Sequence, residues 1–204
     1  MKLARFIRIM MFFPAVIGLG AVVRRILEIT GVTGSSPFGA GVAPHPFIIL
    51  LHILPGALFM ILGPLLFLPR IRNGYPRFHS RSERVVILCG YIIGLSALLL
   101  PFMMKPIGGL NEAAASTFFA IWFLLALTMA SRTRNPGLHH EWMIRMFSIG
   151  LAIGTIRPIV VLFFIFSGLP PQVFFGTAFW IGFTLHLVLA EAWINYSRKS
   201  ITVR

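Results

Sequence analysis

The sequence predicts an all-α, polytopic membrane protein: a six-helix transmembrane bundle with both termini on the cytoplasmic side. Of the 204 residues 57% are apolar and only 11% are charged, whereas a soluble domain carries roughly a quarter charged residues. The mean hydropathy is +0.89. The apolar residues form long unbroken runs, unlike the short alternating segments of a membrane β-barrel. We therefore expect a single integral membrane domain over residues 1–204.

The apolar runs predict helices over residues 6–23, 47–68, 85–104, 111–130, 142–166 and 172–196. The first has only fifteen uncharged residues, so we expect the preceding Arg8 to extend its charge to the interface. Its basic start also fits a cleaved signal peptide, and this alternative stays open. Prolines inside the second run predict a kink, and Gly- and Pro-rich segments predict a loop over 28–46 and turns at 105–109 and 168–171.

The segment between the second and third runs fixes the expected topology. It carries five arginines within residues 70–84, which is typical of a loop held on the cytoplasmic side. Fourteen cations fall on the side of this loop, against three on the other side: Arg24, Arg25 and Lys105. This bias predicts that both termini are cytoplasmic. It leaves Arg24 and Arg25 unexplained.

The net charge of +13 would suggest nucleic acid in a soluble protein. Here the basic residues stand at the ends of apolar runs, so anionic lipid headgroups are the expected partners and nucleic acid is not. One cysteine, Cys89, excludes an intramolecular disulfide. It lies in an apolar run, and we expect it to pack as a small hydrophobic residue.

Arg157 is the most informative polar residue in an apolar run. It lies twelve residues after Arg145, which places it roughly 15 to 18 Å from either membrane surface. A charge at that depth is costly, so we expect Arg157 to face the bundle interior. It either bonds the backbone carbonyl that Pro158 leaves free or holds an anionic or carbonyl-bearing ligand, such as a quinone or a haem propionate.

Two histidines complete a candidate cofactor site with Arg157. His186 lies at a similar depth on the last helix, and His52 lies nearer the outer surface. The depths of His52 and His186 differ by roughly 13 Å, so the two cannot ligate one haem together. The sequence does not identify the cofactor: haem b, held by His52 with His45 of the outer loop or by a single histidine, and a quinone both fit.

The cytoplasmic loops carry a second candidate site, for a transition metal. His79, His139 and His140 could meet there, with Glu83 or Glu141 as a further ligand. The alternative is that these histidines are solvated or face phosphate groups. Glu191 is expected to pair with Arg145 or a loop arginine, or else to relay protons with His79 or His139.

Small residues four apart predict close helix contacts, which concern packing and not function. They are the pairs Gly90 and Gly94, Gly150 and Gly154, and Ala178 and Gly182. Phosphate-binding loops, dinucleotide fingerprints, zinc-protease motifs and nucleophile elbows are all absent from the sequence. No motif therefore assigns an enzymatic reaction.

Several stretches together resemble the bacterial predicted membrane proteins of domain-of-unknown-function family 2306. They are HILPG at 52–56, GPLLFLPRIR at 63–72, YPRFH at 75–79, HHEWMIR at 139–145 followed by Arg157, and LAEAW at 189–193. The resemblance covers residues 45–197. Ser80, His140 and Glu141 stand where the family usually has arginines. The resemblance implies a bacterial cytoplasmic membrane protein and implies no reaction.

The leading hypothesis is a non-catalytic multi-pass protein that binds a small apolar ligand or partner helices around His52, Arg157 and His186. The first alternative is a membrane redox protein that binds haem or quinone through the same residues. The second is a small transporter, for which the Pro-interrupted second and fifth helices are the only indication. An accessory subunit of a larger membrane complex fits the same features.

Overall fold

All regular secondary structure in the described residues is helical. The computed structural model describes the backbone of residues 2–34 and 45–202 and the side chains of residues 12–34 and 45–198. The helices are α1 (Lys2–Ile29), α2 (Pro46–Leu66), α3 (Pro69–Gly74), α4 (Pro76–Met103), α5 (Gly109–Arg132), α6 (Pro136–Phe166) and α7 (Pro171–Thr202).

Five of these helices, α2, α4, α5, α6 and α7, are long and apolar enough to cross a membrane. The chain is therefore an all-α, polytopic membrane protein, as predicted. The sixth predicted span, residues 6–23, falls partly on residues whose side chains lie outside the description. That α1 crosses the membrane stays a prediction.

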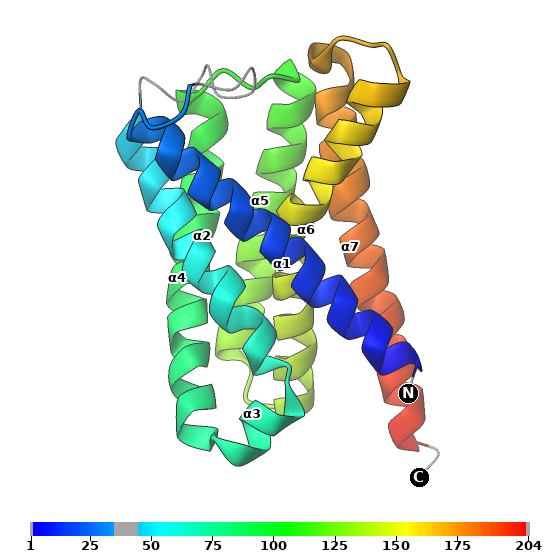
Figure 1. The fold of residues 1–204 in the computed structure, drawn as a ribbon. Coiled ribbons are helices and arrows are strands. Elements are labelled where there is room, and N and C mark those ends of the chain that lie inside the picture. The colour runs from blue at the N-terminus through cyan, green and yellow to red at the C-terminus, as the bar shows by residue number, and fades with distance from the viewer. Residues whose placement is uncertain (1, 35–44, 203–204) are drawn as a thin grey trace.

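The long helices stand side by side, and α1 runs diagonally across one face of the bundle (Figure 1). Successive spans pack on one another, and α5 also contacts α7. The diagonal α1 contacts α2 and α6. It begins, and α7 ends, at the end of the bundle that carries α3 (Figure 1). We call this the α3 end and the opposite end, where α1 ends, the far end.

Prolines mark the starts of the helices. Pro46, Pro69, Pro76 and Pro136 each occupy the first turn of a helix, where the missing N–H costs no hydrogen bond and the fixed φ suits the helix. Asn135 caps α6, because its side-chain oxygen accepts hydrogen bonds from the N–H groups of Gly137 and Leu138.

These starts correct two predicted boundaries. The arginine-rich segment 70–84 is not an irregular loop, because it holds α3 and the first turns of α4, which begins at Pro76 and not at 85. Likewise α6 begins at Pro136 and not at 142. Arginines and histidines indicate where the chain leaves the apolar environment. They do not indicate where a helix begins, because α4 and α6 both extend beyond that environment.

At the far end, α1 continues to Ile29, beyond the predicted end at residue 23. Arg24 and Arg25 therefore lie on a helix, where both pair with Glu28. The predicted loop begins only after Ile29, and its residues 35–44 lie outside the described residues. The predicted turns at 105–109 and 168–171 are confirmed, with Gly109 and Gly168 in the left-handed region at φ +59° and +63°.

The predicted small-residue contacts are confirmed. A Cβ on Gly154 would lie 2.0 Å from the backbone carbonyl oxygen of Pro14, so the backbone of α1 rests directly on α6. Gly94 receives the side chain of Leu124 on α5 in the same way. Cys89 is buried and free, as expected. An aromatic cluster at the centre of the core joins Phe59 to Phe123 and Phe147.

Candidate functional site

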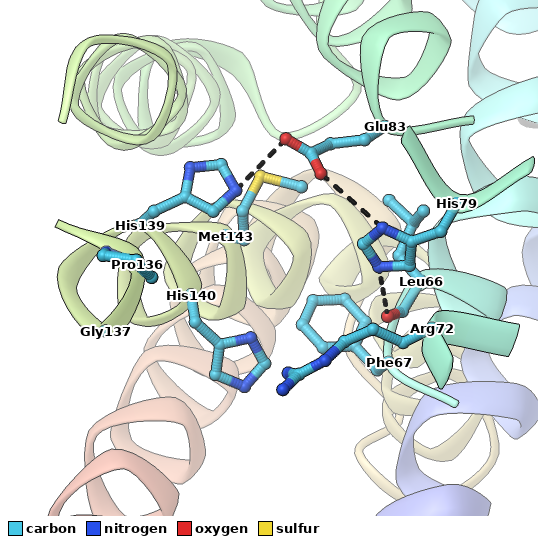
Figure 2. Close-up of a pocket in the computed structure, with 10 residues that line it drawn as sticks. All are labelled: Leu66, Phe67, Arg72, His79, Glu83, Pro136, Gly137, His139, His140 and Met143. Carbon is cyan, nitrogen blue, oxygen red and sulfur yellow. Dashed lines mark hydrogen bonds and ion pairs between the residues drawn. The ribbon is translucent and has the colours of Figure 1, made fainter. Parts of the chain in front are cut away.

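A cavity at the α3 end is lined by five polar side chains together with apolar ones (Figure 2). Its volume is about 490 Å³, within the range typical of small-molecule pockets. The lining comes from the end of α2, from α3, from α4 and from the first turns of α6: Leu66, Phe67, Arg72, His79, Glu83, Pro136, Gly137, His139, His140 and Met143.

His79 ties α4 to the end of α2. Its Nε2 donates a hydrogen bond to the carbonyl oxygen of Leu66 at 3.2 Å, one of the carbonyls that a helix end leaves without a partner. Its Nδ1 lies 3.8 Å from a carboxylate oxygen of Glu83, one turn further along α4. The early start of α4 at Pro76 puts both residues on one helical face.

Glu83 also reaches across to α6. Nε2 of His139 lies 3.2 Å from Oε1 of Glu83, and Nδ1 of His139 donates to the carbonyl oxygen of Ala130 at 2.8 Å. A carbonyl only accepts, so Nδ1 carries a proton. With Glu83 ionised, Nε2 must carry one too. His139 is then an imidazolium, and the His79–Glu83–His139 chain links α2, α4, α5 and α6.

The opposite wall of the cavity is cationic and aromatic. The guanidinium of Arg72 points toward the ring of His140 (Figure 2), and its charge acts on that ring. The same ring packs against the ring of Phe67 in a tilted arrangement, with 5.8 Å between centroids. No ion pair joins Arg72 to a carboxylate among the described residues. The apolar floor of Leu66, Phe67 and Met143 thus ends at an unneutralised guanidinium.

The three histidines predicted to hold a metal, His79, His139 and His140, do line this one cavity. However, His79 and His139 each direct a ring nitrogen to a backbone carbonyl and the other toward Glu83. Glu141, the alternative ligand, pairs instead with Arg145 and Arg198. Within the described residues, no three His, Cys, Asp or Glu side chains are placed to hold a metal ion.

The two histidines of the predicted cofactor site bond to separate partners. Nδ1 of His52 hydrogen-bonds Oγ of Ser96 at 2.9 Å, joining α2 to α4. His186 is only 7% exposed, and its Nε2 hydrogen-bonds Oγ1 of Thr155 at 2.8 Å, joining α7 to α6. Each histidine is therefore a bridge between two helices.

The prediction that Arg157 faces the bundle interior is wrong, because its side chain is exposed. Arg157 follows Thr155 by two residues, which is about 200° around a helix. It therefore projects from the side of α6 opposite to the side that meets His186. Its electrostatic neighbours are Arg24, Arg25 and Glu28 of α1. The sequence predicts that the first helix ends at residue 23, before Arg24. It therefore gives no reason to expect these three residues near Arg157.

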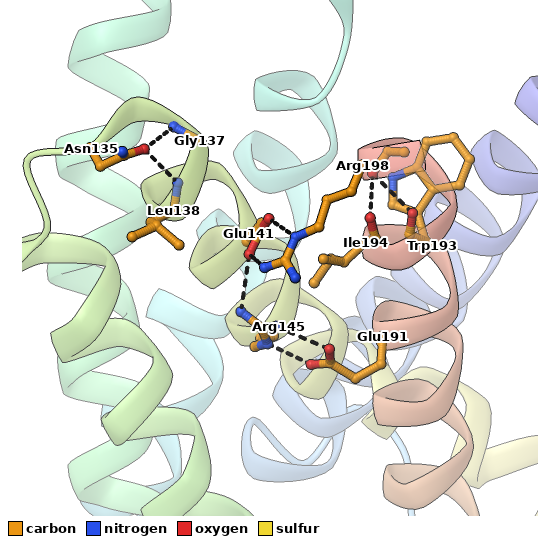
Figure 3. A network of polar contacts seen from close by, with 10 residues as sticks. Asn135, Gly137, Leu138, Glu141, Arg145, Glu191, Trp193, Ile194 and Arg198 are labelled. Carbon is orange, nitrogen blue, oxygen red and sulfur yellow. Dashed lines mark hydrogen bonds and ion pairs between the residues drawn. The ribbon is translucent and has the colours of Figure 1, made fainter. Parts of the chain in front are cut away.

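A second polar network joins α6 to α7 at the α3 end (Figure 3). Arg145 donates through Nε and Nη2 to the two carboxylate oxygens of Glu191, the second at 3.0 Å, which confirms the predicted pair. Its guanidinium lies 4.6 Å from the ring centroid of Trp142. Arg198 donates to Glu141. The paired charges of this network connect helices and leave no free group for a ligand.

Glu83 and Arg72 are the site residues that sequence reasoning underused. From the sequence, Glu83 is expected only as a possible further ligand of a metal ion. Arg72 is expected only as one of the five arginines that indicate the topology. The available signal was the Pro76 start together with the four-residue spacing of His79 and Glu83, which predicts one helical face.

The chain matches the model of a known protein family. A family model described as "Predicted membrane protein (DUF2306)" matches residues 49–194. Nothing among the curated proteins or the solved structures matches the chain. The matched stretch includes every residue that lines the cavity, together with His52, Arg157 and His186.

Proposed function

Because the chain belongs to the DUF2306 family of predicted membrane proteins, we propose that it is a multi-pass membrane protein that binds a small amphiphilic ligand in the cavity at its α3 end. The ligand has an apolar body and an anionic headgroup. It replaces the apolar ligand expected at His52, Arg157 and His186, because the two histidines bond to separate partners and Arg157 is exposed on another side of α6.

The topology proposed for this function has six spans, with α1 as the sixth, and both termini in the cytoplasm of a bacterial cell. The support is the cation count, since the sequence assigns fourteen of the eighteen Lys and Arg residues to the side of the arginine-rich segment 70–84. The cavity then lies at the cytoplasmic surface of the inner membrane, where an amphiphile can enter from the lipid.

The observation that carries the proposal is the guanidinium of Arg72 beside His140, above an apolar floor. An arginine without a carboxylate partner presents a planar donor fork that fits a carboxylate or phosphate group. Leu66, Phe67 and Met143 supply the apolar contact for a chain or ring. Glu83 does not compete for Arg72, because His79 and His139 hold it on the other wall.

The test is a binding titration of dodecanoate, with dodecanol as the uncharged probe of equal chain length, to the full chain in phosphatidylcholine nanodiscs. Arg72→Gln is expected to weaken dodecanoate binding by about tenfold or more, because a hydrogen bond to a charged group contributes about 1.5–3 kcal/mol. Arg70→Gln is the matched control, since Arg70 also lies on α3 but does not line the cavity. Equal binding of dodecanoate and dodecanol would contradict the proposal.

The proposed lipid partners are anionic headgroups at the first turns of α4. Arg77, Arg81 and Arg84 are exposed there and line a shallow groove together with Ser80. No ion pair joins these three arginines to a carboxylate within the described residues. Unpaired cations at the edge of a membrane span attract anionic lipids by about 1 kcal/mol each.

A further inference from the structure

The helix α4 lies at the edge of the bundle (Figure 1). Among the described helices it contacts α2, α3 and α5, and its buried residues, such as Ser82 and Val86, lie on that side of it. The opposite side of α4 carries exposed residues from its first turn to its last. No helix of the described chain covers this outward side, so a lipid can lie against it.

One stripe runs along the outward side of α4. At about 100° per residue, six exposed positions fall within about 60° of one another around the helix axis. They are Arg77, Arg81, Arg84, Leu88, Leu95 and Leu99. The three leucines are between 51% and 62% exposed. The stripe is therefore cationic at the α3 end and apolar farther along the span, which is the pattern that an anionic lipid beside the helix requires.

The three arginines of the stripe line one groove, of about 370 Å³, together with Pro76 and Ser80. Because a helix rises about 1.5 Å per residue, these arginines extend over roughly 10 Å of α4. The carboxylate nearest to them along the chain, Glu83, lies on another side of α4 and contacts His139. Within the described residues no carboxylate pairs with the three guanidinium groups, so their charges are not neutralised by the protein.

A headgroup with a single phosphodiester leaves most donors of this groove without an acceptor. It carries one negative charge and two non-bridging oxygens, which match about one bidentate guanidinium. Two phosphodiesters supply twice as many oxygens and charges, and the hydroxyl of Ser80 adds a further donor. Tyr75, at the start of α4, is 63% exposed, as is typical of a tyrosine at a membrane interface.

We propose that the arginine groove of α4 binds a lipid whose headgroup carries two phosphodiester groups, with acyl chains along Leu88, Leu95 and Leu99. This assignment specifies the anionic lipid proposed above, and it rests on the proposed position of the α3 end at a membrane surface. Free diphosphate has the same charged groups but leaves the leucines without a contact. The groove is separate from the cavity that takes the amphiphilic ligand, because the two share no lining residue.

The test measures lipid binding to the detergent-purified full chain by native mass spectrometry. Cardiolipin is the probe with two phosphodiesters, and phosphatidylglycerol, compared at equal phosphate concentration, is the probe with one. Cardiolipin is expected to bind about tenfold or more tightly, because its second phosphate adds charge-assisted hydrogen bonds. Inorganic diphosphate, the probe without chains, is added as a competitor and should not displace cardiolipin at equal concentration.

Arg81→Gln is expected to weaken cardiolipin binding by about tenfold or more. Arg81→Lys should weaken it less, because lysine keeps the charge but loses the planar donor fork. Both variants should fold, since Arg81 is exposed. Arg134→Gln is the matched control and should leave binding unchanged, because Arg134 is an exposed arginine at the α3 end that does not line the groove.

Phosphatidylglycerol that binds as tightly as cardiolipin would overturn the assignment of two phosphodiesters. Displacement of cardiolipin by equal diphosphate would overturn the assignment of a lipid. Cardiolipin binding that is absent from the wild type, or unchanged in Arg81→Gln, would overturn the site. Dodecanoate binding should be the same in Arg81→Gln and wild type, and cardiolipin binding should be the same in Arg72→Gln and wild type, so the two proposals fail independently.

Discussion

Glu83 on α4 lies 3.2 Å from His139 on α6, and this pair joins two helices that are not neighbours along the chain. Both side chains are 27% exposed, so solvent weakens the interaction without removing it. The other ring nitrogen of His139 is held by the carbonyl of Ala130. The pair therefore connects α4 to the α5–α6 turn at the rim of the cavity.

Glu83→Gln should lower the free energy of unfolding by about 1–2 kcal/mol, the value for a partly solvated hydrogen bond between charged groups. The measurement is thermal or denaturant unfolding of the detergent-purified protein, compared with Arg134→Gln. A variant as stable as wild type would show that the pair contributes nothing to the fold.

The bidentate pair of Arg145 and Glu191 should contribute about as much, although the Arg145 side chain is only 13% exposed. Arg145→Met leaves Glu191 without its partner and removes the contact with the Trp142 ring. The Glu191 side chain is 45% exposed, so solvent compensates part of the lost interaction, and we expect a loss of about 1–2 kcal/mol. The double variant Arg145→Met/Glu191→Met should recover part of this loss, because no unpaired carboxylate remains.

The same unfolding assay, applied to the four members of this double-mutant cycle, measures the coupling. Additive losses in the double variant would mean that the two residues act independently despite their contact.

Composition and the spacing of apolar runs were enough to predict the class of fold. The positions of the spans were predictable as well, since each depends on one helix alone. The pairing of Arg145 with Glu191 was predictable because the two residues have similar depths in the membrane. The ends of the helices at the membrane surface were not predictable from charge, because neither arginines nor histidines stop a helix. The prolines at 69, 76 and 136 carried that information.

The candidate site was harder to predict for a geometric reason. The rotation of a helix about its axis decides which neighbouring helix a residue faces. The depth of a residue in the membrane does not determine this rotation. Arg157 and His186 have similar depths, yet Thr155 directs His186 to one side of α6 and Arg157 projects from the other. Likewise Glu83 meets His139 only because α4 and α6 present those faces to the same cavity.

Thr155→Val should destabilise the protein by about 1–3 kcal/mol, the cost of leaving a buried polar group unpaired. The change preserves the side-chain shape but removes the hydroxyl that contacts Nε2 of the buried His186. Thr155→Ser retains the hydroxyl and should cost less. Unfolding of the purified variants decides the matter, and equal stability of Val and Ser variants would argue against a stabilising role for this bond.

Gly154→Ala should displace α1 from α6. The added methyl would lie 2.0 Å from the carbonyl oxygen of Pro14, and a backbone atom cannot move aside as a flexible side chain can. We expect a destabilisation of about 1–3 kcal/mol from overpacking. We also expect faster proteolysis of α1, since the helix loses its close contact.

Gly56→Ala is the matched control for this prediction. Gly56 also lies inside a helix, but a Cβ there would meet nothing within 4 Å. Alanine favours the helix over glycine by up to about 1 kcal/mol, so Gly56→Ala should be neutral or stabilising. If the two variants behave alike, α1 does not rest on Gly154. In that case Gly154 would not be the point at which the backbone of α1 is held against α6, and the contact between the two helices would depend on their other residues.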